Sequence, residues 1–384
     1  MKKILACLAL LSLWSFQIHA QPVTMTIYGT FDNEAPKGQA PKVIESTNDS
    51  ISIYGTIDAG VRHVTNTNAR GGDLWTVGSN GHYYNNRIGV KGTEDLGGGL
   101  NAHFHFETGF NSGTGALDNN QNRLFNRISS VGVAGDFGSL DLGRQPSVAC
   151  KVVHAYDPFS YRFVQLIPLA GAVAGNADPD NPFGKLGGTR FSNAAQYIGK
   201  FGGFTGMAEY SFGEEAGSNS DGSAKAIGFV YRFAEHAIGA AYTRQRPNVA
   251  AANAAPVFAD QDQLTIGGSW KSGPLRIAGG YIGASSDTTR PATLRTARNI
   301  WLGGSYDVNP LVSLTTGYYR SNIESTSGAK AQRDLTLIGA TYALSKRTNL
   351  YANIDRVKLG GFISVVAGRE TMQTGISVGI NHMF

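Results

Sequence analysis

The sequence predicts an all-β protein, a transmembrane antiparallel β-barrel of about 16 strands. Segments of roughly ten residues alternate between apolar and polar side chains, and the connections between them are in turn short and long. Beyond the first residues, no stretch is apolar enough for a spanning helix. The 50 glycines, 16 tyrosines and 19 phenylalanines fit strands joined by glycine turns and do not fit an all-α enzyme.

The chain opens with a segment typical of an export signal. Two lysines precede the apolar run 4–14, and the small residue Ala20 stands at a suitable cleavage site. We therefore expect residues 1–20 to be a signal peptide. Only Cys150 then remains, so no internal disulfide is possible. The net charge of +5 is mild and dispersed, which gives no indication of nucleic acid binding.

One motif occurs twice near the N-terminus, as TIYGTFD at 26–32 and as SIYGTID at 52–58. The second copy continues as an alternating strand, whereas the first runs into NEAPKGQAPK, whose prolines remove donors and fix φ. We therefore expect 51–64 to be the first barrel strand and 21–50 to be an N-terminal extension, either flexible or entering the lumen. Alternatively, the two copies compete for one position beside the last strand.

Apolar and polar residues alternate along the rest of the chain as far as TGISVGINHMF, which indicates strands with one apolar and one polar face. The predicted strands lie near 51–64, 83–93, 100–110, 123–134, 138–145, 189–199, 203–212, 224–233, 237–245, 262–270, 274–284, 297–306, 310–321, 333–343, 347–357 and 374–384. A barrel of about sixteen strands is too wide to be filled by side chains, so its polar face is expected to meet water.

The connections sort by length. Short ones such as EDLGGG at 94–99 and KSGP at 271–274 carry the glycine and proline that tight turns need. Long ones are expected near 65–82, 111–122, 146–188, 213–223, 246–261, 285–296, 322–332 and 358–373. Short turns at one end and long loops at the other are typical of outer-membrane barrels.

Four stretches are diagnostic together: SIYGTIDAGV at 52–61, NRIGVKGTEDLGGGLNAHFHFETGF at 86–110, LFNRISSVGVAGDFGSLDLGRQ at 124–145 and VGINHMF at 378–384. They resemble the trimeric general porins of Gram-negative outer membranes, especially the β-proteobacterial type. The resemblance extends over 51–384. It implies a sixteen-stranded barrel whose third long loop, here 146–188, folds into the lumen, and passive diffusion of small hydrophilic solutes and ions.

The same resemblance implies partners and a location. We expect a homotrimer in the outer membrane, in contact with membrane lipid and lipopolysaccharide, with periplasmic termini and with loop 111–122 reaching over the next subunit. The barrel-assembly machinery would read Phe384 as its signal on the last strand. Nothing implies a cofactor, a metal or nucleic acid as a partner.

A channel of this kind selects ions by the charges at its constriction. The porins carry arginines on the wall that faces the inward loop. Four positions match them: Arg87 in NRIGVKG, Arg127 in NRISSVG, Arg144 in LGRQ and Arg190 in TRFSNAAQY. An ordinary salt bridge of the barrel wall is the alternative for each. By strand parity, Lys91 shares the face of Arg87.

Further candidates come from the first strand and from the third loop. Asp58 and Arg62 face the lumen by parity alone. The resemblance implies that Asp157, in the family's Asp-Pro-Phe element, faces the basic wall. The loop departs from the family pattern because it also carries the basic residues Lys151, His154 and Arg162. We therefore expect weak anion selectivity.

Other functions would depend on specific residues. A sugar-specific channel would use an aromatic ladder, which the third loop could supply with Tyr156, Phe159, Tyr161 and Phe163. A surface barrel that binds a host through its long loops is a further alternative. His103, His105 and Glu107 share one strand face, where lumen lining is favoured over a metal site. No local spacing of serine, histidine and aspartate indicates a catalytic triad, so no enzyme is expected.

Overall fold

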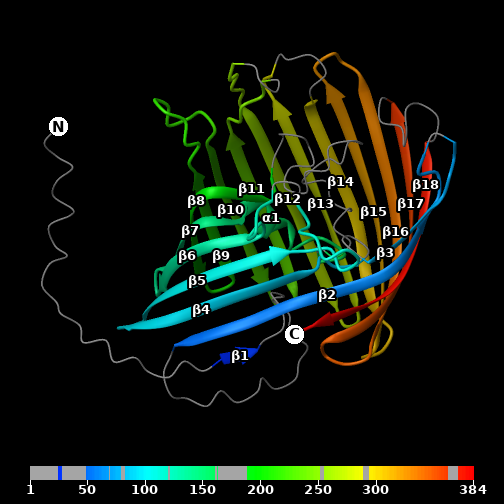
Figure 1. Cartoon of the computed structure of the whole chain (residues 1–384), viewed down its shortest axis with the longest axis horizontal. Helices are drawn as coiled ribbons and strands as arrows, with labels where there is room; N and C mark the ends of the chain where they lie inside the picture. Colours follow the sequence, from blue (N-terminus) through cyan, green and yellow to red (C-terminus); the bar gives the residue numbers. More distant parts are fainter. Residues whose placement is uncertain are drawn as a thin grey trace, which may run out of the picture.

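In the computed structural model of the chain, sixteen strands form one closed antiparallel barrel (Figure 1). The structure describes residues 25–27, 49–68, 70–78, 83–119, 122–160, 162, 188–250, 255–288, 294–361 and 371–384. No helix in these ranges is long and apolar enough to cross a membrane.

The barrel strands follow one another around the ring in chain order, and the last pairs with the first to close it. They are β2 (Ser50–Val64), β4 (Arg87–Gly97), β5 (Leu100–Gly109), β6 (Ile128–Gly135), β7 (Gly138–Pro146), β8 (Arg190–Phe201), β9 (Phe204–Ser211), β10 (Ala224–Phe233), β11 (His236–Gln245), β12 (Gln261–Ser272), β13 (Leu275–Ser286), β14 (Leu294–Asp307), β15 (Val312–Ser325), β16 (Lys330–Ala343), β17 (Thr348–Gly361) and β18 (Met372–Met383). Two short strands, β1 (Met25–Ile27) and β3 (Leu74–Gly78), pair with β2, and one short helix, α1 (Val148–Val153), follows β7.

The barrel exposes apolar side chains and buries polar ones. On β2, Ile57 and Val61 are 43% and 40% exposed, whereas Thr56 and Asp58 are almost fully buried. A water-soluble protein would bury such an apolar face. In hydrocarbon the arrangement is favourable, because the outer band meets lipid and the backbone N–H and C=O groups of adjacent strands in the closed ring pair with one another.

All sixteen predicted barrel strands are confirmed, but some bounds were wrong. β4 runs to Gly97 and β5 begins at Leu100, so the turn predicted at 94–99 has only two residues. So tight a turn is possible because Gly97, Gly98 and Gly99 all adopt positive φ (82°, 63° and 80°). The predicted long loop 322–332 is also wrong. β15 extends to Ser325 and β16 begins at Lys330, which leaves a short turn between them.

The described start of the first copy of the repeated motif lies beside the second copy. β1 pairs with β2 in parallel, and the motif residues within β1 are in register with the second copy, with Thr26 opposite Ser52 and Ile27 opposite Ile53. β18 covers β2 only from Thr56 onward. β1 therefore pairs with the part of β2 that β18 does not reach, and it is not a strand of the closed ring (Figure 1).

The barrel begins and ends at its short-turn end. β2 starts there and β18 finishes there, with the C-terminus beside the start of β2 (Figure 1). The backbone N–H and C=O of Phe384 exchange hydrogen bonds of 3.1 and 2.9 Å with Gly55, which completes the β2–β18 closure.

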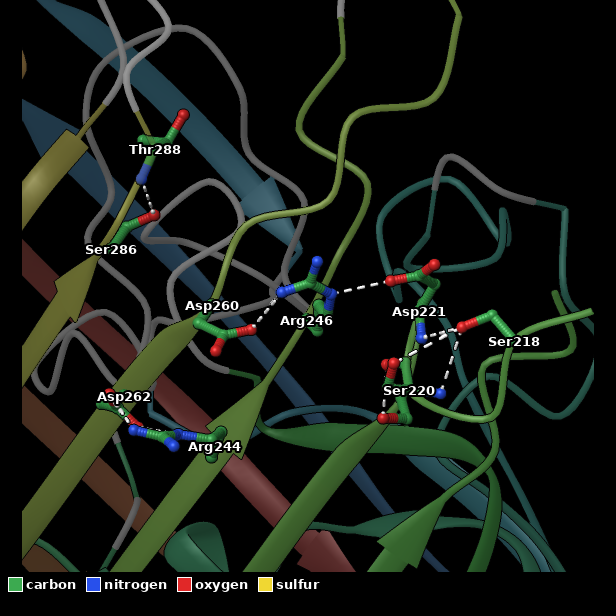
Figure 2. A network of polar contacts seen from close by, with 10 residues as sticks. Ser218, Ser220, Asp221, Arg244, Arg246, Asp260, Asp262, Ser286 and Thr288 are labelled. Atoms are coloured by element: carbon green, nitrogen blue, oxygen red, sulfur yellow. Dashed lines mark hydrogen bonds and ion pairs between the residues drawn. The ribbon is translucent and has the colours of Figure 1, made fainter.

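Ion pairs tie neighbouring loops together at the opposite rim (Figure 2). Arg246, which follows β11, donates from Nε to Asp221 Oδ1 at 2.7 Å and from Nη1 to Asp260 Oδ1 at 2.8 Å. One guanidinium thus joins the connection before β10 to the connection before β12. The hydrogen bond from Arg246 lowers the pKa of the Asp221 carboxyl below its ordinary value.

Candidate functional site: the pore constriction

The segment after β7 folds into the barrel and packs on the inner wall. Ser147 caps the N-terminus of its helix α1, since Ser147 Oγ accepts a hydrogen bond from Cys150 N at 3.2 Å. Val148 N donates to Glu209 Oε2 on β9 at 3.1 Å. Val152 and Val153 are fully buried. Valine is a modest helix former, so these contacts rather than propensity hold α1 in place. The inward fold predicted for the third loop is confirmed for residues 147–160.

Lys151 leaves α1 toward the barrel wall. Its Nζ donates to Gln196 Oε1 on β8 and, at 3.4 Å, to Gln145 Oε1 at the end of β7. Burial lowers the pKa of this ammonium group, because a charged form is costly away from water. Lys151 therefore ties the loop to the wall beside it.

One arginine orders the turn that follows α1. Arg276 of β13 donates to three backbone carbonyls, those of Asp157 at 2.9 Å, Ala155 at 3.2 Å and Pro158 at 3.4 Å. A single guanidinium thus bonds three neighbouring carbonyls of the turn, two of which also accept hydrogen bonds from Ser269 Oγ and from Ser160 N.

Aromatic side chains complete the anchor. The Trp301 indole of β14 donates to Tyr156 O at 3.1 Å, and the two rings stack with centroids 5.8 Å apart. The Tyr156 hydroxyl lies 2.7 Å from Thr265 Oγ1 on β12. Tyr156 and Phe159 are both buried against the wall. They therefore do not form an aromatic ladder along the pore, and the other two residues of the proposed ladder, Tyr161 and Phe163, lie outside the described residues.

Asp157 belongs to the same anchor. The sequence predicts it as an acid facing the basic wall, and the structure differs. The Asp157 side chain is 1% exposed, and its Oδ1 accepts a hydrogen bond of 3.0 Å from the Tyr319 hydroxyl on β15. The turn held by Arg276 directs this carboxylate into the wall of β15, where it holds the loop.

The acid that meets the predicted arginines is Glu107 of β5. Arg127 donates from Nε to Glu107 Oε1 at 2.5 Å, and Arg87 Nε of β4 lies 3.6 Å from Oε2. The Tyr54 hydroxyl of β2 donates to Oε2 at 2.7 Å. One carboxylate thus lies between two guanidinium groups. In the sequence alone, Glu107 stands out only as a neighbour of two histidines. Its pairing with the arginines becomes visible only from the register of β4 with β5.

Two tyrosines contact arginines on this wall. Arg87 donates from Nη2 to the Tyr84 hydroxyl at 2.8 Å, and its guanidinium carbon lies 4.4 Å from the Tyr84 ring centroid. Arg162 reaches over from the third loop and donates to the Tyr83 hydroxyl at 2.8 Å. Aromatic faces attract cations, which lowers the cost of bringing two arginines together. Arg162 from the loop therefore adds to the basic wall.

The other predicted cations lie around this group. Arg144 of β7 is buried and donates to Asn126 O at 2.6 Å and to Ser192 Oγ at 2.9 Å. Arg190 begins β8 and is half-buried, and Lys91 of β4 is half-buried with its Nζ 5.6 Å from the Tyr54 ring centroid. β7 and β8 are neighbours in the ring, whereas β5 and β6 lie between β7 and β4.

Arg62 and Asp58 face inward, as parity predicts, but take part in wall contacts. Arg62 forms a bidentate pair with Asp355 of β17 at 2.6 and 2.9 Å and also donates to Ser377 Oγ at 2.9 Å. Asp58 is fully buried and accepts from the Tyr351 hydroxyl at 3.0 Å. A wall salt bridge therefore describes the contacts of Arg62, as it does the pairs that Arg87 and Arg127 form with Glu107.

The two histidines of β5 contact different partners. His103 Nε2 lies 2.7 Å from Asp141 Oδ1 of β7, whereas His105 Nε2 lies 2.5 Å from the Tyr54 hydroxyl. Within the described ranges, no group of three or more histidine, cysteine or acidic side chains is arranged to hold a metal ion.

Comparisons with known proteins match this architecture. The profile of the Gram-negative porins matches residues 9–361. The chain belongs to the Gram-negative porin family. This porin is 28% identical to an outer membrane porin protein of Bordetella pertussis and to outer membrane porin protein 32 of Delftia acidovorans, in each case over 87% of this chain and 94% of the relative. An anion-selective porin from Comamonas acidovorans superimposes with a TM-score of 0.72 at 26% identity, over 88% of this chain and 100% of that chain.

Family, fold and inward loop together give the function. The porin is an outer-membrane channel for passive diffusion. A substrate-specific or host-binding barrel is not favoured.

Proposed function

We propose that this porin is a trimeric, weakly anion-selective pore for small hydrophilic solutes and ions, without enzymatic activity. The observation that carries the proposal is the cationic excess on one wall, where Arg87 and Arg127 share the single carboxylate of Glu107 and Arg162 approaches from the loop. Fixed positive charge in a narrow aqueous passage concentrates anions and repels cations. The related porin from Comamonas acidovorans is described as anion-selective, which supports the same selectivity here.

In this proposal the predicted residues divide into two groups. Arg87, Arg127, Arg144 and Arg190 set the charge at the constriction, and Lys91 adds to it. Arg62, Asp58 and Asp157 position the wall and the loop through their contacts with other side chains.

The membrane arrangement is part of the same proposal. Residues 1–20 direct export, and both termini lie in the periplasm because the barrel begins and ends at its short-turn end. Phe384 is the signal for the assembly machinery. Lipopolysaccharide and other outer-membrane lipids contact the apolar band. Three subunits associate, which the mass of the unheated, purified protein would test.

Ion selectivity is tested by the reversal potential across a planar bilayer with a salt gradient. The double variant Arg87→Gln/Arg127→Gln leaves Glu107 without its two guanidinium partners, so the local charge changes sign and the reversal potential should move toward cations. The triple variant with Glu107→Gln added should lie between it and the unmodified porin. Arg244→Gln is the control, because Arg244 is exposed on the outer surface and pairs with Asp262. An unchanged reversal potential in the double variant would contradict the proposal.

A further inference from the structure

The start of β2 projects beyond the end of the last strand. β18 covers β2 only from Thr56 onward, and the chain ends at Phe384, which exchanges both of its backbone hydrogen bonds with Gly55. β2 itself begins at Ser50, at the short-turn end of the barrel. Within the described ranges, no strand of the closed ring therefore pairs with residues 50–54 on the side that faces β18.

This side of residues 50–54, the projecting edge, has the regular geometry of a strand. Successive residues of a strand direct their N–H and C=O groups alternately to its two sides. Gly55 directs both groups to Phe384, so Ile53 and Ile51, two and four positions earlier, direct theirs to the same side. An edge of this kind is a template for another strand.

The projecting edge is held in place from its other side. There β2 pairs with β4, with Tyr54 opposite Gly89, and Asp95 N of β4 donates to Asp49 Oδ1 at 2.9 Å. Ser52 and Tyr54 are buried on the inner face of the barrel. Contacts that do not involve β1 therefore keep this segment extended, and the edge exists before any strand binds to it.

β1 lies along the projecting edge (Figure 1). Because the motif is repeated, similar residues stand opposite one another, Thr26 opposite Ser52 and Ile27 opposite Ile53. In-register pairing of like segments is how strands recognise their own sequence. Parallel neighbours need a connection of a dozen residues or more, and residues 28–49 supply it.

We propose that the projecting edge is a strand-docking site selective for the repeated motif, and that the chain's own N-terminal segment is its exchangeable occupant. β1 has only three residues, so its pairing can open while the barrel stays closed. A short tether raises the effective concentration of a segment to about a millimolar, which favours the chain's own copy over a free strand. Docked β1 covers backbone groups that would otherwise pair with another chain. The proposal depends on where β18 ends and is independent of the ion selectivity of the pore.

Disulfide formation in the purified porin tests the register of docking. Ile27→Cys/Ile53→Cys joins opposite positions, whose Cα atoms on neighbouring strands are about 5 Å apart, so a disulfide should form within one chain. Met25→Cys/Ile53→Cys is the matched control, because its positions are two residues out of register and about 8 Å apart. It should be oxidised at least about 10-fold more slowly. Cys150 is buried and common to both variants.

Hydrogen exchange tests the docking itself. Thr26→Pro removes the central backbone donor of β1, so the amides of Ile51 and Ile53 should exchange on the order of 10-fold faster. Thr26→Val keeps the donor and should exchange as the unmodified porin does. A free peptide with the sequence of residues 22–30, at millimolar concentration, should restore slow exchange in Thr26→Pro, whereas a scrambled peptide should not. Heat-modifiable mobility on gels would establish that each barrel is folded.

Several results would overturn the proposal. Equal oxidation of the two cysteine pairs would refute the register, and a disulfide between two chains would assign the projecting edge to a second copy. Equal exchange in Thr26→Pro and Thr26→Val would show that β1 does not cover the edge. Equal protection by the scrambled peptide would refute selectivity for the motif.

Discussion

Replacing Arg276 by methionine should loosen the loop that narrows the pore. Methionine keeps much of the length and apolar contact of the arginine but cannot donate to the three carbonyls of the turn at Ala155, Asp157 and Pro158. The Ala155 and Asp157 carbonyls would keep only their hydrogen bonds from Ser269 Oγ at 2.9 Å and Ser160 N at 3.2 Å, and the Pro158 carbonyl would lose the bond from Arg276. The anchors at Trp301 and Tyr156 would remain, so the fold of the barrel itself should be preserved.

The expected magnitude follows from the contacts. A hydrogen bond from a charged donor contributes about 1.5 to 3 kcal/mol, and two of the three, at 2.9 and 3.2 Å, have good length. The loss is therefore at least about 3 kcal/mol, which lowers the ratio of docked to released loop by more than about 100-fold. The loop should leave its docked position far more often than in the unmodified porin.

Single-channel recording measures this directly. The Arg276→Met variant should show greater open-channel noise and a higher mean conductance. Arg244→Met is the matched control, because it also removes an arginine paired with neighbouring groups but on the outer surface, away from the loop. If folded Arg276→Met channels had the conductance and noise of the unmodified porin, the assignment of Arg276 as the anchor would be refuted.

Three further outcomes are expected. Gly55→Val should reduce the yield of folded, heat-modifiable barrel on gels, because a Cβ there would clash with the Phe384 ring and lie 2.7 Å from Arg87 O, whereas Gly360→Val, where a Cβ meets nothing within 4 Å, should fold normally. Glu107→Gln should move the reversal potential toward anions, since it leaves two guanidinium groups without their shared carboxylate, and a shift toward cations would contradict this. The hydrogen bond from Arg246 lowers the pKa of Asp221 from its ordinary value of about 3.8. The contact therefore stabilises the loops above that pH and is lost as the pH falls through the lower pKa of the folded state. A spin label at Ala216 should be more mobile at pH 2 than at pH 7, and equally mobile at both in Arg246→Gln.

Strand positions were predictable because the apolar contrast between the two faces is strong. Ile57 and Val61 alternate with Asp58 and Arg62, so period two identified both the strand and its lumenal side. The same contrast fails at the ends of β14 to β17. Outward residues there are charged, such as Arg298 and Lys330, while inward residues such as Ile323 and Ala331 are apolar, so the pattern of the lipid-facing band is lost and predicts loops where the strands in fact continue.

The side chains with which these residues pair were harder to predict than the strand face on which each lies. Parity placed Arg87 inside, but its pairing with Glu107 depends on the register between β4 and β5, which alternation within one strand does not specify. Asp157 lies in a turn whose direction is set by Arg276, a residue more than a hundred positions later in the chain. Long-range contacts of this kind leave no local signal in the sequence.

The central claim is an open channel, narrowed by the third loop and lined by an excess of cations. Single-channel conductance of the purified porin in a planar bilayer with a salt gradient tests it most directly. The claim predicts conductance steps in groups of three and a reversal potential that indicates a weak preference for anions. A silent bilayer, or a reversal potential that indicates a strong preference for cations, would contradict it.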